Sequence, residues 1–215
     1  FREGVVGGGQ LVFSKERLSF FNGRVEGRPI VLCVVGECFD VTSGRRFYFG
    51  AEEEYNWFAG RDASAAFVTG QFNEQGAHDD LSNFDGAQLG EVGHWLQFYN
   101  NHEVYTKVGV VEGKYFGKDG SPTAQRQQVL DAIEAERKRK EEDKRLFPPC
   151  NSRYTPETGT TFWCEPDSGG VKREWKGFVR TRDNLCVCVP PERLDHPSLG
   201  KLKGCEDDVS TCTIR

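Results

Sequence analysis

The spacing of hydrophobic residues divides the chain into three segments. Over residues 1–117, short apolar runs alternate with turn residues, a pattern typical of a small domain of mixed strands and helices. Over residues 118–146, apolar side chains recur at a helical period within a highly charged sequence. Residues 147–215 contain six of the eight cysteines. We therefore predict an α+β fold: a mixed domain, a long charged linker helix and a small disulfide-rich subdomain.

A tight β-hairpin is predicted where two runs of β-branched residues flank a glycine. Ile30–Val35 and the run after Gly36 are the expected strands, with Val35 and Gly36 as the two-residue turn. In this register Cys33 faces Cys38 as a non-hydrogen-bonded pair, whose Cα atoms lie about 4.5 Å apart. This spacing allows a disulfide. A cross-strand disulfide and a pair of buried free thiols both fit the sequence.

Two short helices are expected in the same segment. Ser14 suits the N-cap of a helix that runs to Phe21, and Asn22-Gly23 would end it. A second helix is expected to start near Asp62, directly after an aromatic stretch.

The third expected helix is long and highly charged. It should begin after Ser121-Pro122 and end before Pro148-Pro149, because proline fits the first turn of a helix but cannot continue one. One narrow apolar face predicts that its first half packs on a domain; this face consists of Val129, Leu130 and Ile133. The basic run 137–140 is followed at once by acidic residues, which indicates a solvated, salt-bridged face rather than a surface for nucleic acid or anionic lipid.

The cysteines indicate a disulfide framework and hence an oxidising compartment, either the extracellular space or the lumen of the secretory pathway. Zinc is the competing interpretation, but neither a CxxC pair nor a Cys/His pairing at zinc-finger spacing occurs. Six tail cysteines allow about fifteen pairings. Cys186 and Cys188 should bond to different partners, since alternation points both to one face of a strand. Trp163 and Trp175 are expected to supply the small core of this segment.

Composition excludes several classes of function. The net charge of −5 argues against a nucleic-acid-binding protein, which needs a basic face. No apolar stretch approaches the roughly 18 residues of a membrane span. Because the sequence starts at Phe1 and contains no Met, we interpret it as a mature chain or as one that begins inside its gene. No hydrolase, P-loop or dinucleotide motif occurs, the four histidines are interpreted as packed or surface residues, and no enzymatic activity is expected.

Residues 44–64 are the best candidates for a ligand site, because they concentrate tyrosines and other aromatic residues. A phenolate oxygen can bind ferric iron, and tyrosine is one of the few protein ligands of haem. Flat aromatic walls suit a flat apolar macrocycle. Aromatic core packing is the alternative interpretation of the same pattern.

Three strings in the first segment resemble successive signatures of the cytochrome b5-like haem/steroid-binding domain. They are LVFSKERL at 11–18, VGECFDVTSG at 35–44 and FAGRDAS at 58–64, and the pattern continues with DDLS at 79–82 and with Trp95. FAGRDAS is typical of the membrane-associated progesterone receptor family, and the histidine-containing ligand motif of true cytochrome b5 is absent. The tail, including FPPCN at 147–151 and CVC at 186–188, resembles a branch of that family with a cysteine-containing tail.

The resemblance implies a site for haem b. In this family a tyrosine before FAGRDAS binds the iron, and the matching residue here is Tyr55. The resemblance makes Tyr48 a supporting hydrogen-bond donor and places Tyr105 near the haem edge. The resemblance also implies a non-enzymatic role in signalling or in regulating a protein partner. A steroid or another apolar molecule is a further implied ligand.

Three departures from the family pattern support a second hypothesis. The loop from Tyr48 to Tyr55 is one residue longer, Ala51–Glu54 replaces a Gly/Pro-rich stretch, and Val104 stands where a lysine often precedes the last tyrosine. Three carboxylates beside a site for haem propionates would repel them unless they point outward. The alternative is therefore a protein that has lost its haem and uses the fold as a protein-binding scaffold.

Overall fold

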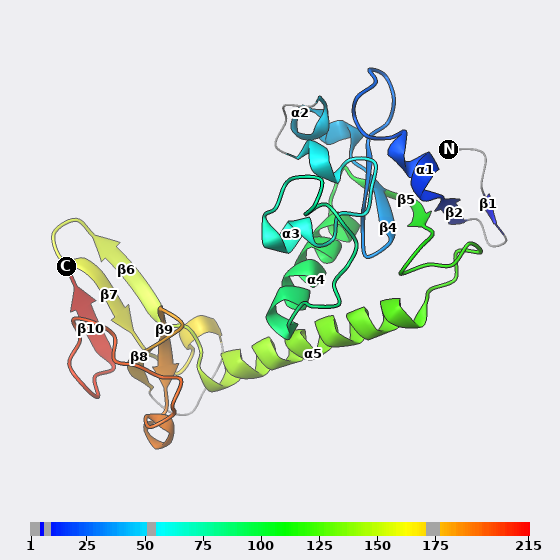
Figure 1. Ribbon diagram of the computed structural model, residues 1–215. Coiled ribbons are helices and arrows are strands. Elements are labelled where there is room, and N and C mark those ends of the chain that lie inside the picture. The colour runs from blue at the N-terminus through cyan, green and yellow to red at the C-terminus, as the bar shows by residue number, and fades with distance from the viewer. Residues whose placement is uncertain (1–4, 7–9, 51–54, 171–176) are drawn as a thin grey trace. The chain divides into compact units, whose positions relative to one another are not determined.

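The chain folds as two compact units, Phe1–Arg137 and Lys138–Arg215, which Figure 1 shows as a ribbon. The computed structural model describes all residues except 1–4, 7–9, 51–54 and 171–176. The expected triple of carboxylates, Glu52–Glu54, therefore lies outside the described residues.

The first unit is built on a five-stranded sheet with the strand order β1-β2-β5-β4-β3. The strands are β1 (Val5–Val6), β2 (Gln10–Phe13), β3 (Val31–Val34), β4 (Glu37–Asp40) and β5 (Thr106–Val111). β2 and β5 run parallel, and the other neighbours are antiparallel. The strand period of two places Leu32 and Val34 in one apolar cluster, and Val31 and Cys33 in another on the opposite face.

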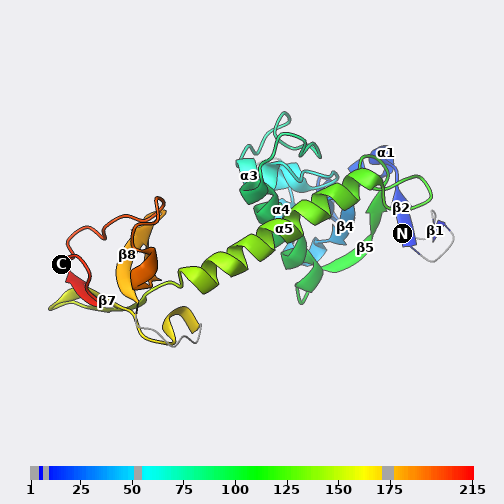
Figure 2. The same ribbon diagram turned by 90° about the horizontal axis from the view of Figure 1, so that it is seen from below.

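Helices cover both faces of this sheet. The helices of the described chain are α1 (Lys15–Ser19), α2 (Arg45–Tyr48), α3 (Ala66–Thr69), α4 (Gly86–Asn101) and α5 (Ala124–Leu146), with short 3₁₀ turns η1 (Thr42–Gly44) and η2 (Asn56–Phe58) in the first unit. Figures 1 and 2 both show α3 and α4 on one side of β4 and α1 on the other. The larger cluster, which includes Phe39, Phe58 and Tyr99, lies on the α3/α4 side and contains most of the buried aromatic residues.

The predicted hairpin and first helix are confirmed. Cys33 pairs with Cys38 across β3 and β4, and the two form a disulfide with their Cα atoms 4.1 Å apart. Val35 and Gly36 both adopt positive φ, at 48° and 76°, as the favoured two-residue hairpin turn requires. Ser14 caps α1, where its hydroxyl accepts a hydrogen bond from the Arg17 backbone N–H.

The prediction of a helix starting near Asp62 is wrong. Asp62 lies in an extended segment that forms an isolated bridge with Cys33, and α3 begins only at Ala66. The Asp62 carboxylate accepts hydrogen bonds from the backbone N–H groups of Gly36 and Ser64, so it binds a turn on another element instead of capping a helix.

Within the first unit, α5 packs on the domain as predicted. Val129 and Leu130 contact the larger apolar cluster, and Ile133 lies directly against Gly93 of α4. The basic run 137–140 is exposed, and Arg137 pairs with Glu134 one turn earlier, which confirms the solvated, salt-bridged face.

The second unit consists of short antiparallel strands linked by disulfides. They are β6 (Asn151–Thr155), β7 (Gly159–Trp163) and β10 (Thr211–Ile214) in one sheet, and β8 (Phe178–Arg182) and β9 (Leu185–Val189) in another, with 3₁₀ turns η3 (Ser168–Gly170) and η4 (Pro191–Arg193). Cys186 bonds to Cys150 and Cys188 to Cys164, which confirms that neighbours in the CVC motif have different partners. Cys205 bonds to Cys212.

The prediction for the core of this unit needs correction. Trp163 is only partly buried, and Trp175 lies outside the described residues. The buried clusters are formed instead by strand residues and half-cystines, namely Phe147, Val187 and Val189 in one cluster, and Cys164, Val179 and Cys188 in the other. Disulfides therefore provide much of the packed apolar volume that so short a segment otherwise lacks.

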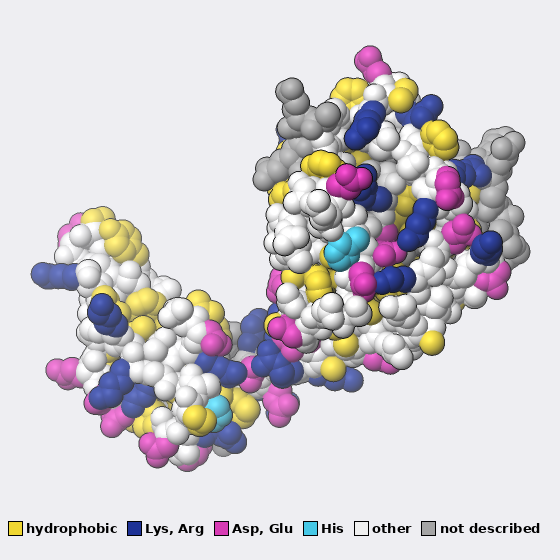
Figure 3. All heavy atoms as spheres, viewed as in Figure 1, with side chains coloured by type: hydrophobic (Ala, Val, Ile, Leu, Met, Phe, Trp, Pro, Cys, Tyr) yellow, Lys and Arg dark blue, Asp and Glu magenta, His cyan; other side chains and the backbone are white. Residues whose placement is uncertain are grey.

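Positive and negative side chains are interspersed on the face of each unit drawn in Figure 3. That face carries no continuous basic stripe among the residues described, in keeping with the net charge of −5.

Candidate functional site

A pocket on the α3/α4 side of the first unit is lined by aromatic residues from several elements. It has a volume of about 360 Å³. The lining residues are Phe47, Tyr48, Tyr55, Phe58, Phe67, Phe72, Trp95, Phe98, Tyr99 and Tyr105. The structure thus brings together all three tyrosines expected at the site. Flat apolar walls with a few hydroxyl groups suit a flat apolar ligand.

Tyr55 lies at the mouth of the pocket. It directly precedes η2, and its side chain is 39% exposed. Its ring contacts those of Tyr48, Phe58 and Phe72, with centroids 5.9–6.2 Å away. Its hydroxyl makes no hydrogen bond to any other residue in the described part of the chain, so its oxygen is available to a ligand.

Tyr48 lies deeper and is hydrogen-bonded to a tyrosine that the sequence reasoning missed. The hydroxyl oxygens of Tyr48 and Tyr99 are 3.1 Å apart, and both side chains are buried. Burial raises the pKa of Tyr48, and the neighbouring hydroxyls of Tyr99 and Tyr105 raise it further. Burial likewise raises the pKa of Tyr99. The signal for Tyr99 was its position one helical turn after Trp95, which places both on one face of α4.

Tyr105 closes the far side of the pocket just before β5. Its ring stacks on His102 with centroids 3.8 Å apart, and on Tyr99 at 5.9 Å. Its hydroxyl packs directly against Gly44, where any Cβ atom would overlap it. A side chain at position 44 would therefore displace the Tyr105 ring from its place in the pocket.

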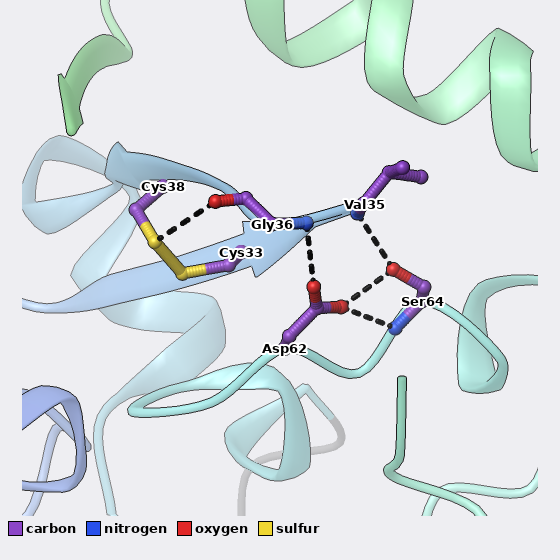
Figure 4. The surroundings of a disulfide bond; sticks show 6 residues. All are labelled: Cys33, Val35, Gly36, Cys38, Asp62 and Ser64. Carbon is purple, nitrogen blue, oxygen red and sulfur yellow. Dashed lines mark hydrogen bonds between the residues drawn. A yellow bond between two sulfur atoms is a disulfide. The ribbon is translucent and has the colours of Figure 1, made fainter. Parts of the chain in front are cut away.

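The FAGRDAS segment that follows Tyr55 is held in place by the hairpin turn, as Figure 4 shows. Asp62 accepts hydrogen bonds from Gly36 N–H at 2.6 Å and from the Ser64 hydroxyl at 2.5 Å, while Ser64 Oγ accepts one from Val35 N–H at 2.8 Å. Burial raises the pKa of Asp62 to about 6, against these hydrogen bonds, which favour the ionised form. These contacts hold Val35 at a positive φ, which is costly for a β-branched residue, and anchor the chain just after Tyr55.

The charged surroundings of the mouth differ from the family pattern. Val104 is 59% exposed and offers no cation. The guanidinium of Arg46 lies 4.5 Å from the ring centroid of Phe47, a lining residue, so a cation is still present beside the mouth. The residues therefore fit haem: aromatic walls for the macrocycle, an unpaired phenol for ferric iron and, over the lining residue Phe47, an arginine as a cation for a propionate.

The sequence is similar to known proteins over most of its length. A family model described as the cytochrome b5-like heme/steroid binding domain matches residues 14–111 and defines the class of the first unit. Human neuferricin is 38% identical over 233 residues, which cover 96% of this chain and 87% of neuferricin. Membrane-associated progesterone-binding protein 4 of Arabidopsis thaliana is 34% identical, over 94% of this chain and 84% of that protein. The chain belongs to the neuferricin family.

Among solved structures, a hypothetical protein from Arabidopsis thaliana with a cytochrome b5-like fold is 32% identical. It covers 48% of this chain and 93% of its own, with a TM-score of 0.43. No helix in the described part of the chain has the length and apolar character needed to cross a bilayer.

Proposed function

We propose that the first unit binds haem b in the aromatic pocket, with the Tyr55 oxygen as ligand to ferric iron. The observation that carries this proposal is an aromatic pocket of about 360 Å³ whose exposed phenol, Tyr55, has no hydrogen-bond partner in the described chain. When bound, haem supplies a ferric centre that a phenolate stabilises. Tyr48 supports the phenolate as a hydrogen-bond donor, Tyr105 contacts the haem edge, and Arg46 pairs with a propionate.

The protein as a whole acts as a non-enzymatic haem-binding protein in the extracellular space or the secretory lumen. All eight cysteines are in disulfides, which persist in oxidising compartments. Its role is signalling or regulation of a protein partner, as the resemblance to its family implies.

A hemin titration tests the proposal. The purified oxidised chain should show a saturable Soret band with a high-spin ferric phenolate signature, and Tyr55→Phe should lose it. Tyr154→Phe is the matched control, because Tyr154 is 70% exposed on β6 of the second unit, outside the pocket. Absence of a saturable band from a folded wild-type protein would overturn the proposal, as would equal bands from wild type and Tyr55→Phe.

A second candidate function uses the same pocket without haem. The exposed Val104, in place of a family lysine, favours a scaffold that binds protein partners or an apolar ligand such as a steroid. In that case hemin fails to bind, whereas a steroid quenches the fluorescence of Trp95 or a partner buries the exposed pocket rim in hydrogen-exchange experiments.

A further inference from the structure

Tyr99 is a buried pocket tyrosine outside the set of three that the family resemblance implies. It lies on α4, its side chain is almost fully buried, and its hydroxyl is 3.1 Å from that of Tyr48. Its ring packs between those of Trp95, Phe98 and Phe39, with centroids 5.1–6.4 Å away. The hydroxyl is therefore held in one place by packing on several sides.

The number of protons on the two phenols limits which hydrogen bonds Tyr48 and Tyr99 can donate. Each phenol has one proton to donate, whereas a phenolate can only accept. If Tyr48 donated to Tyr99, no proton of Tyr48 would remain for the oxygen of Tyr55, whose ring lies 6.2 Å from that of Tyr48. If Tyr99 donates instead, Tyr48 keeps its proton for Tyr55. Phenols are protonated at neutral pH, and either hydroxyl of this pair can be the donor.

We propose that Tyr99 is a positioning residue of this site: by donating to the Tyr48 oxygen, it directs the Tyr48 proton toward the Tyr55 phenolate. This inference rests on the proposed haem function. Hydrogen bonds in such a chain polarise one another, so the bond to Tyr55 is strengthened. A phenolate that accepts a hydrogen bond donates less charge to ferric iron, and Tyr99 thereby tunes the iron through Tyr48.

The test is Tyr99→Phe, which removes the hydroxyl and keeps the ring. In hemin-loaded protein, the Fe–O(phenolate) stretch should move to higher frequency and the reduction potential to a more negative value. Hemin affinity should fall by about tenfold, as is usual for the loss of an outer-sphere partner. Tyr115→Phe is the control, because Tyr115 is also a buried tyrosine but donates to the Asp79 carbonyl outside the pocket.

A double variant separates a relay from a packing effect. If Tyr99 acts through Tyr48, Tyr99→Phe should cause no further shift of the Fe–O stretch in a Tyr48→Phe background. Independent, additive shifts would overturn the inference, and so would wild-type values for Tyr99→Phe alone. A wild-type chain that binds no hemin overturns the proposed function and this inference together, whereas binding that depends on Tyr55 but not on Tyr99 overturns this inference alone.

Discussion

Glu37 is the centre of a buried polar network that joins the hairpin to α4, β5 and α5 of the first unit. The Glu37 side chain is 8% exposed. Its carboxylate accepts hydrogen bonds from Lys107 at 2.7 Å and from Asn100 at 3.1 Å, and it forms a close ion pair with Arg126. The Arg126 guanidinium also stacks on Phe116, and its Nε has no hydrogen-bond partner among the described residues. We predict that Glu37→Gln destabilises the first unit, because it leaves the Arg126 charge without its counterion.

The expected loss follows from the exposure of each partner. Breaking a fully buried ion pair by removing one member costs about 3–5 kcal/mol. Arg126 is 15% exposed and Lys107 40%, so water replaces part of the lost interaction for Lys107. We therefore expect a decrease in the free energy of unfolding of about 2–3 kcal/mol at pH 7, since hydrogen bonds to charged groups are worth about 1.5–3 kcal/mol.

The effect should depend on pH in a defined direction. Burial raises the pKa of Glu37, but Lys107, Asn100 and Arg126 outweigh burial and hold the pKa below its usual range. A carboxyl with a lowered folded-state pKa stabilises the protein above its unfolded pKa of about 4.3, and this contribution is lost as the pH falls through the folded-state value. The difference in the free energy of unfolding between wild type and Glu37→Gln should therefore have its full size at pH 7 and shrink below about pH 4.

Hydrogen exchange during urea unfolding is the assay, because peptides covering residues 31–40 report the first unit alone. The control is Glu134→Gln. Glu134 lies on α5 in the same unit and pairs with Arg137 at the surface, so we expect its substitution to lower the free energy of unfolding by less than about 1 kcal/mol. A loss for Glu37→Gln no larger than that of the control would refute the reasoning. A difference that grows toward acid pH would refute the assigned direction of the pKa shift.

Three further predictions concern stability and are checked by urea denaturation. Replacing Cys33 and Cys38 together by serine should lower the free energy of unfolding by about 2 kcal/mol, because the short cross-link no longer restricts the unfolded chain; an unchanged midpoint would contradict this. Gly93→Val should cost about 1–3 kcal/mol and increase hydrogen exchange in α5, because any Cβ at this position overlaps Ile133; unchanged exchange would show that α5 does not depend on this contact. Ser14→Ala should cost about 1 kcal/mol through loss of the α1 cap, whereas Ser14→Asp should retain stability.

Sequence alone determined the elements whose contacts are local. The turn residues Val35 and Gly36 set the hairpin register, and that register placed Cys33 opposite Cys38. Serine and proline positions likewise predicted both ends of α5 and the cap of α1, because caps and turns depend on residues only a few positions apart. The three expected tyrosines also line one pocket, although their roles toward haem stay a prediction.

The tertiary structure decided what depends on residues far apart in the chain. Asp62 has the local appearance of a helix start, yet it binds a turn 26 residues earlier, since the nearby N–H groups of that turn compete for its carboxylate. Tyr99 meets Tyr48 across 51 residues, and Arg126 meets Glu37 across 89. Such pairings arise only when the sheet and helices bury these polar groups together, because a buried polar atom must find a partner wherever the fold supplies one. Short-range sequence patterns therefore do not predict these long-range pairings.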